Sequence, residues 1–242
     1  MKLLTVVPAR LKSARLPHKP LLKIAGKTMI RRTLERVLAA GLSPVALATD
    51  AEEILHECAD IPGVIPVMTR EDHSCGTERV LECYKKLQPR LGDFDLIINV
   101  QGDEPFIEAD LLRELVWELE RRQGKAEFFT TVADLPEDER ADVNVAKAVL
   151  DQNDNALIFT REPLHLAKKH TSVYVYSPAF LIRFCSLPPS PLEKAYRLEQ
   201  MRALDNGLRL NCIYLPYDSV SINDLKDLAK AGVTDFEPWN PA

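Results

Sequence analysis

Short apolar runs alternate with amphipathic segments along the first hundred residues, and this alternation restricts the possible folds more than any other feature. The runs are rich in β-branched residues, as is typical of strands buried in a parallel sheet, and they cover residues 3–7, 45–49 and 96–100. Two segments between them, 28–40 and 77–88, carry apolar residues at helical spacing. The order β-α-β-α-β predicts right-handed crossovers and helices on both faces of the sheet.

The rhythm changes after residue 128, where strand candidates follow one another with few residues between them. They cover 128–133, 146–150, 155–160 and 172–176. The polar cluster at 152–155 predicts a hairpin turn between the second and the third. Further along, the pattern predicts a helix, a strand, a second helix and a polar, frayed tail, over 192–206, 210–215, 222–231 and 237–242.

The composition excludes several classes of protein. With 242 residues, 46% of them hydrophobic, the chain can bury the core of one large α/β domain. A formal charge of −5 without a basic stripe argues against a nucleic-acid partner. No apolar run approaches the roughly 18 residues that span a bilayer, and no export signal precedes the first strand. Because no export signal is evident and the five cysteines are odd in number, we expect reduced thiols and a cytoplasmic location. The cysteines show no CxxC spacing, so we expect no zinc site.

Positively charged side chains gather in the loop that follows the first predicted strand. Arg10, Lys12, Arg15 and Lys19 lie within ten residues of one another in an otherwise acidic chain. Open α/β sheets bind ligands at the carboxyl ends of their strands, and guanidinium groups suit phosphate oxygens. The loop therefore predicts a triphosphate site, against the alternative of a solvated basic loop.

The third predicted strand ends in Gln101-Gly102-Asp103-Glu104. A glycine at this edge permits close approach of the backbone, and the aspartate after it offers a hard oxygen ligand. Magnesium prefers one or two carboxylates together with phosphate oxygens and water. We therefore expect Asp103 to bind magnesium opposite the basic loop, although a Gly-Asp pair by itself is more often only a turn.

Between these two segments, residues 73–79 read His-Ser-Cys-Gly-Thr-Glu-Arg. Ser74 or Thr77 is expected to cap the helix that follows. The free amides at the start of that helix would also suit an anion or the edge of a base. His73 is expected to have only a minor role.

Six segments carry a family resemblance: PARLKSARLPHKPL, HSCGTERV, NVQGDEP, NVAKAVLD, ALIFTR and PPSPLEKAYRLEQMRAL. In this order they resemble the 3-deoxy-manno-octulosonate (KDO) cytidylyltransferases, also called CMP-KDO synthetases, from residue 3 to about 228. The resemblance implies a Rossmann-like nucleotidyltransferase fold with a mostly parallel sheet and helices on both faces. It implies a single domain over 1–242, in which about 128–210 form a mixed-sheet subregion for sugar binding and dimerisation.

The resemblance also implies an activity and the residues that serve it. CMP would pass from CTP to the anomeric hydroxyl of KDO with release of pyrophosphate, in a magnesium-dependent homodimer that serves lipopolysaccharide synthesis. The nucleotide-binding positions would be Pro8, Ala9, Arg10, Arg15, Lys19, Ser74, Gly76, Thr77 and Arg79. The sugar-binding positions would be Gln101, Arg161, His170, Tyr174, Glu199 and Gln200. Catalysis would rest on Arg10, Lys19 and the metal ligand Asp103, through positioning and charge neutralisation.

Four features depart from the family pattern. His18 replaces a glycine beside the phosphates, and Tyr196 replaces a common glutamate. The stretch between Arg161 and His170 is only eight residues long. Ser221 stands nearest to the family's second metal-binding aspartate, and a hydroxyl is a poorer magnesium ligand than a carboxylate.

The departures leave alternatives open. The carboxylates of Asp218 or Asp224 could replace the missing ligand at Ser221. Because the shortened segment adjoins the sugar site, CMP transfer to another acidic sugar, such as an amino-KDO or a nonulosonate, is a second interpretation. A third is a catalytically weak homologue that binds the nucleotide without turnover.

Overall fold

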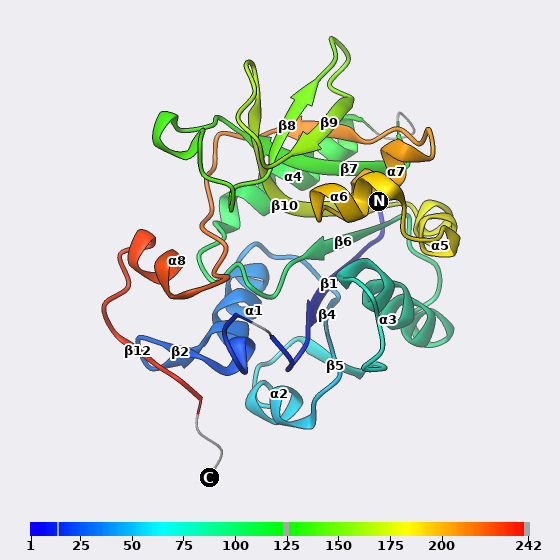
Figure 1. The fold of residues 1–242 in the computed structure, drawn as a ribbon. Coiled ribbons are helices and arrows are strands. Elements are labelled where there is room, and N and C mark those ends of the chain that lie inside the picture. The colour runs from blue at the N-terminus through cyan, green and yellow to red at the C-terminus, as the bar shows by residue number, and fades with distance from the viewer. Residues whose placement is uncertain (14, 123–125, 240–242) are drawn as a thin grey trace. The chain divides into compact units, whose positions relative to one another are not determined.

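The computed structural model describes residues 1–13, 15–122 and 126–239, which divide into two compact units (Figure 1). The first unit contains Lys2–Leu112 and the chain from Ser219 onward. The second contains Arg113–Asp218 together with Met1. The first unit is therefore built from both ends of the chain.

A parallel sheet forms the centre of the first unit. Its strands are β1 (Leu3–Ala9), β4 (Val45–Thr49), β5 (Val64–Met68) and β6 (Leu96–Val100), in the order β6-β1-β4-β5. The parallel strands predicted at 3–7, 45–49 and 96–100 are confirmed. Strand β5 was not predicted, because it contains Pro66 and is only partly buried, as edge strands often are.

Helices cover this sheet on both sides, with α1 (Met29–Ala39) and α3 (Gly76–Leu91) lying on opposite sides of β1 and β4 in Figure 1. Both match the predicted segments 28–40 and 77–88. A short helix, α2 (Glu52–Glu57), precedes β5, and α4 (Ala109–Arg121) follows β6. The buried residues of α1 recur at helical spacing and pack its apolar face against the sheet.

The C-terminal segment adds a small antiparallel sheet to the first unit. Strand β12 (Phe236–Glu237) pairs with β2 (Lys23–Ile24), which pairs with β3 (Lys27–Thr28). A short 3-10 helix, η1 (Lys19–Leu21), precedes β2. Ile222 and Leu228 pack with Ile24 in a shared apolar cluster. The prediction of a frayed tail from residue 237 is wrong at Glu237, because that residue is in β12, and 240–242 lie outside the described residues.

The second unit contains the mixed strands expected after residue 128. They are β7 (Phe128–Ala133), β8 (Lys147–Leu150), β9 (Ala156–Thr160), β10 (Lys168–Tyr176) and β11 (Asn211–Tyr214). Strand β7 pairs in parallel with β11 and antiparallel with β10, and β8 pairs antiparallel with β10 and β9. The predicted hairpin turn is confirmed: the Asp151 carboxylate accepts hydrogen bonds from the amides of Asn153 and Asn155.

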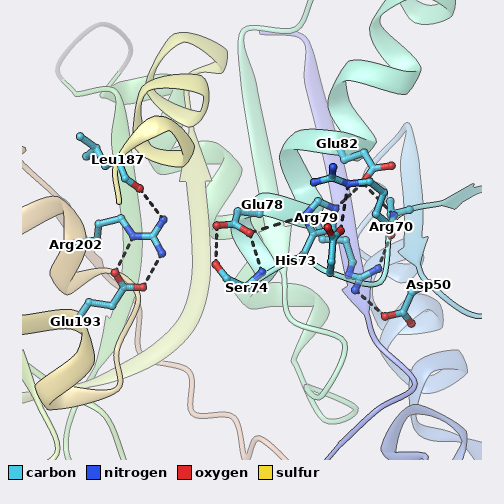
Figure 2. Close-up of polar contacts among 12 residues, drawn as sticks. Asp50, Arg70, His73, Ser74, Glu78, Arg79, Glu82, Leu187, Glu193 and Arg202 are labelled. Atoms are coloured by element: carbon cyan, nitrogen blue, oxygen red, sulfur yellow. Dashed lines mark hydrogen bonds and ion pairs between the residues drawn. The ribbon is translucent and has the colours of Figure 1, made fainter. Parts of the chain in front are cut away.

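The helix predicted over 192–206 is wrong, because the structure has two short helices there. These are α6 (Pro191–Tyr196) and α7 (Met201–Asp205), and Arg197 between them has the left-handed φ of 55°. The Arg202 guanidinium makes two hydrogen bonds, of 2.8 and 2.7 Å, to the Glu193 carboxylate (Figure 2). In one straight helix these residues would lie about 14 Å apart along the axis. The break thus allows the pair to form.

Two further helices have clear caps. Helix α5 (Pro178–Ser186) begins after Ser177, whose hydroxyl accepts a hydrogen bond from the amide of Phe180. Helix α8 (Leu225–Lys230) is shorter than the predicted 222–231, because Asp224 forms its N-cap and Ile222 is buried in the core before it begins. A second 3-10 helix, η2 (Glu137–Glu139), precedes β8. No helix among the described ranges combines the length and apolarity needed to cross a bilayer.

Candidate active site

A pocket of about 300 Å³ opens where β1 and β6 of the first unit end. It is enclosed by the loop after β1, the start of α3, the turn after β6 and one residue of the C-terminal segment. Its lining residues are Pro8, Ala9, Arg10, Lys12, Ser13, Arg15, Lys19, Pro20, Met29, His73, Ser74, Cys75, Gly76, Arg79, Gln101, Gly102, Asp103 and Asn223. Of the predicted nucleotide and metal positions, all except Thr77 are in this set. Thr77 is fully buried.

The close approach of two strand ends shapes the floor of this pocket. A Cβ atom placed on Gly102 would lie only 2.7 Å from the carbonyl oxygen of Pro8, a distance that real Cβ contacts do not reach. Gly102 therefore lets the end of β6 lie directly against the end of β1. This contact brings Asp103 next to the basic loop, as the sequence predicted.

One cationic side chain of the loop pairs with the carboxylate of Asp103. The Lys19 ammonium lies 2.7 Å from an Asp103 carboxylate oxygen and 3.4 Å from the side-chain oxygen of Asn223. The Arg15 guanidinium donates to the same Asn223 oxygen at 3.1 Å. Two oxygen atoms from distant parts of the chain thus hold one ammonium group in the pocket.

Ser221 does not face this pocket, which corrects the expectation that it stands at a metal-binding position. The hydroxyls of Ser219 and Ser221 each donate to a different carboxylate oxygen of Glu104, which is 1% exposed. The suggested replacements are also engaged, because Asp218 pairs with Lys169. Asp224 accepts hydrogen bonds from two amides at the start of α8. Asn223, which sequence reasoning missed, is the pocket residue of this segment.

The start of α3 forms another wall of the pocket. The Glu78 carboxylate accepts hydrogen bonds from the amide and the hydroxyl of Ser74, at 2.8 and 2.6 Å (Figure 2). Cys75, not Ser74 or Thr77, is the N-cap residue, and it makes no side-chain capping bond. Gly76 lies against Gln101, whose side-chain oxygen would be 3.4 Å from an added Cβ. The predicted cap residue is therefore wrong, although the helix start does line the pocket.

A buried ion pair and a contact between a histidine and a carboxylate hold this wall in place. Arg79 lies 2.8 Å from Asp50, and both side chains are almost completely buried. His73 contacts Glu82 through its Nε2 atom (Figure 2). Burial opposes ionisation of Glu82, but hydrogen bonds from Lys86, the Arg70 amide and His73 lower the pKa of Glu82 to about 2.

In the second unit, three of the predicted sugar residues lie together. The Tyr174 hydroxyl donates to the Gln200 side-chain oxygen at 3.1 Å, and the rings of His170 and Tyr174 are 5.3 Å apart. Burial, with a smaller contribution from the charge of Arg161, lowers the pKa of His170 to about 3, so its imidazole is neutral.

The hydrogen bonds around His170 fix which nitrogen carries the proton. The Thr130 hydroxyl donates to the Val173 carbonyl and lies 2.8 Å from His170 Nε2, so Nε2 is the donor in that contact. Nδ1 then presents a lone pair. Among the described residues this buried atom has no hydrogen-bond partner, and neither has the side-chain nitrogen of Gln200. A hydroxyl group could donate a hydrogen bond to a lone pair such as that of Nδ1 and accept one from an N–H group such as that of Gln200.

The other predicted sugar residues have different surroundings. Arg161 donates to the carbonyl oxygens of Val143 and Asn144. Glu199 lies half-buried in the turn between α6 and α7, and Gln101 lies in the pocket of the first unit. Of the departures from the family pattern, Tyr196 ends α6, and His18 packs against Trp239 with ring centroids 4.8 Å apart.

Comparison with known proteins places the chain in a family. A family model described as Cytidylyltransferase matches residues 4–210, and the chain belongs to this family. The chain is 39% identical to the 3-deoxy-manno-octulosonate cytidylyltransferase of Brucella anthropi, with 96% of each chain covered. It is 40% identical to the enzyme of that name from Azorhizobium caulinodans, which covers 94% of this chain and 93% of the relative.

A solved structure is similar along almost the whole chain. It is a CMP:2-keto-3-deoxy-manno-octonic acid synthetase complexed with CTP, and it shares 32% of its sequence with this chain. The TM-score is 0.85, and the match covers 96% of this chain and 97% of the other. The predicted nucleotidyltransferase fold and the resemblance to KDO cytidylyltransferases are therefore confirmed.

Proposed function

We propose that this chain transfers CMP from CTP to the anomeric hydroxyl of KDO, giving CMP-KDO and pyrophosphate. The observation that carries the proposal is the pocket itself: Arg10, Lys12, Arg15 and Lys19 line it opposite Asp103. These groups suit a triphosphate and its counter-ion. The relatives that are about 40% identical over the whole chain carry the name of this activity.

The basic loop would bind and orient CTP. A triphosphate carries several negative charges, and Arg10, Arg15 and Lys19 can neutralise them through charge-assisted hydrogen bonds. The same groups would stabilise the negative charge that grows on the departing pyrophosphate when the sugar oxygen attacks the α-phosphate. The wall at Ser74 and Gly76 would position the ribose or the base, as the resemblance of this segment to the family implies.

Magnesium is the proposed cofactor, and the residues present fit it. Asp103 and Asn223 already hold a cationic ammonium group between their oxygen atoms. Carboxylate and amide oxygens are also the ligands that hard cations prefer. When bound, magnesium would neutralise phosphate charge and favour the attacking alkoxide form of the sugar oxygen.

The second unit offers groups that can bind sugar hydroxyls. The neutral His170 presents the lone pair of Nδ1, and Gln200 presents an N–H group, both buried and unsatisfied within the described part of the chain. Burying such atoms without partners costs about 1–3 kcal/mol each, which a bound hydroxyl would recover. Arg161 and Glu199 remain candidates for the sugar carboxylate and hydroxyls.

The setting of the reaction is part of the proposal. We expect the enzyme to act as a homodimer in the cytoplasm, where CTP is available, and its product to serve lipopolysaccharide synthesis. The cysteines are free thiols, in agreement with a reducing compartment. Sedimentation velocity at micromolar concentration would test the dimer.

The test of the function is pyrophosphate release from CTP and magnesium with KDO, an amino-KDO or a nonulosonate as acceptor. Release with KDO at the highest kcat/KM supports the proposal. Faster release with another acidic sugar would keep the CMP transfer and change the acceptor. CTP binding in calorimetry without release by any acceptor would contradict the proposed catalysis.

A further inference from the structure

His18 has a backbone conformation that residues of its type seldom adopt. Its φ of 52° and ψ of 31° lie in the left-handed region, where a Cβ atom is sterically unfavourable and glycine is not. Histidine is enriched there among the residues other than glycine, but it is still uncommon. A histidine at this position therefore points to a contact of its ring, which a glycine could not make.

The ring of His18 packs against the indole of Trp239. Their centroids are 4.8 Å apart and their planes are inclined by 51°, within the range of roughly 4.5–7 Å in which aromatic pairs attract one another. Both residues are partly buried, and the Nδ1 atom of His18 is buried without a hydrogen-bond partner among the described residues. Packing against Trp239, and not a hydrogen bond of Nδ1, therefore holds the ring.

Trp239 is brought to this position by the last strand of the chain. Strand β12 pairs with β2, which follows η1 directly, and both belong to the first unit (Figure 1). The amide of Ala25 also donates to the Asp235 carbonyl oxygen at 2.9 Å. Because Trp239 lies only two residues beyond β12, this backbone pairing brings its ring to the residue that precedes η1.

His18 is bonded directly to a residue of the pocket. It is the N-cap residue of η1, and its carbonyl oxygen accepts a hydrogen bond from the Leu21 amide at 2.9 Å. Lys19 is the first residue of η1, and its ammonium lies 2.7 Å from the Asp103 carboxylate. Because His18 begins this turn, a movement of its backbone would move the Lys19 side chain as well.

From these contacts we infer that Trp239 is a positioning residue, which acts through His18 to hold Lys19 where it binds the triphosphate. The inference rests on the proposed function and goes beyond it, because Trp239 is not among the residues that line the pocket. An aromatic contact of ordinary strength favours one loop conformation over its alternatives about fivefold. Since CTP binding needs Lys19 in place, loss of the contact should weaken that binding by about the same factor.

The experiment measures the CTP affinity of the full chain by calorimetry with magnesium and without a sugar. Trp239→Ala and His18→Asn should each raise the Kd for CTP about fivefold. Asparagine is chosen because it also adopts the left-handed conformation readily and lacks the ring. The double variant should bind no more weakly than either single variant, since both remove the same contact. Trp239→Phe keeps an aromatic ring and should bind CTP within about twofold of the wild type.

The other of the two tryptophans provides a matched control. Trp117 is 54% exposed, its ring contacts the Arg121 guanidinium, and it does not line the pocket. Trp117→Ala removes an indole as Trp239→Ala does and should leave the CTP affinity unchanged. In Trp117→Phe the remaining indole is that of Trp239, so its fluorescence reports on this contact. Acrylamide should quench that fluorescence more strongly when His18→Asn is added.

Steady-state kinetics separates positioning from a general loss of structure. In Trp239→Ala the KM for CTP should rise about fivefold, whereas kcat and the KM for KDO should stay within about twofold of the wild type. A fall in kcat together with a rise of both KM values would show general destabilisation and contradict the positioning role.

The remaining outcomes separate the inference from the proposed function. If the wild type binds CTP and Trp239→Ala binds it equally well, the inference is wrong and the proposed function stands. If the effects of Trp239→Ala and His18→Asn multiply in the double variant, the two residues act independently and the inference is also wrong. If the wild type itself binds no CTP, the proposed function fails and the inference fails with it.

Discussion

Replacement of Glu193 by glutamine should destabilise the second unit strongly, although Glu193 lies outside both candidate binding regions. The Arg202 side chain is 1% exposed and makes two charge-assisted hydrogen bonds to Glu193, at 2.8 and 2.7 Å. Glu193→Gln removes the negative charge and turns an NH₂ group or a neutral oxygen toward a buried guanidinium. Breaking a buried ion pair by removing one of its partners costs about 3–5 kcal/mol. Two hydrogen bonds to charged groups, at about 1.5–3 kcal/mol each, give a similar sum.

The measurement is thermal unfolding followed by circular dichroism at pH 7. For a chain of this size, 1 kcal/mol corresponds to roughly 2–4 °C, so the expected decrease in Tm is roughly 6–20 °C. The control is Glu127→Gln, which breaks the exposed pair of Glu127 and Arg183 at 3.5 Å and should cost less than about 1 kcal/mol.

A further variant removes both charged members of the pair. Arg202→Met together with Glu193→Leu removes both charges and should recover a large part of the lost stability, because hydrophobic replacements of buried pairs are often neutral. A Tm of Glu193→Gln within 2 °C of the wild type would refute the reasoning, since the Arg202 charge would then have to be compensated in another way.

The other predictions concern the pocket and the buried histidine. Asp103→Asn should lower kcat at least about 100-fold with unchanged circular dichroism. The control is Asp93→Asn, which alters an exposed hydrogen-bond acceptor of Gln88. Near-normal turnover of Asp103→Asn would show that Asp103 is not a metal ligand. Gly102→Ala should lower the free energy of unfolding by about 1–3 kcal/mol and weaken CTP binding, because the added Cβ would collide with the Pro8 carbonyl oxygen. An unaltered CTP affinity in calorimetry would contradict this reasoning. The pKa of His170 is lowered to about 3 in the folded chain, so the unfolded chain takes up a proton at this residue at a higher pH than the folded chain does. The contribution of the neutral His170 to the free energy of unfolding is therefore complete above about pH 6.5. It is lost toward pH 3, by about 1.4 kcal/mol per pH unit. Urea unfolding between pH 7 and 5 should therefore show a shallower pH dependence in His170→Gln than in the wild type, and parallel curves would exclude His170 as the cause.

Much of the sheet could be predicted from the sequence because the strands are continuous apolar runs between turn residues. The strands at 45–49, 96–100 and 128–133 have the predicted bounds. The break between α6 and α7 could not be predicted in the same way. Arg197 adopts a left-handed conformation that favours glycine, and the buried pair formed across the break is a tertiary interaction without a local signal.

The candidate site shows the same division between local and distant interactions. The basic loop and Asp103 were predictable, since both follow strands that end at one edge of a parallel sheet. The place of Asn223 was not, because it depends on a backbone bond between Ile222 and Asp103, residues far apart in sequence. The sequence shows Ser221 near the position at which the family has an aspartate. Only the structure shows that the hydroxyl of Ser221 is bound to Glu104.

The construction of the first unit from both ends of the chain has a consequence for how the protein is made. Asn223, the partners of Glu104 and strand β12 are synthesised only after the whole second unit, Arg113–Asp218. At about 5–20 residues per second, a ribosome needs roughly 5–20 s to add that stretch. During this interval the nascent chain exposes an unfinished pocket and an open apolar cluster around Ile24. A message truncated before codon 219 would therefore yield a protein with the basic loop and Asp103 but without the segment that completes their pocket.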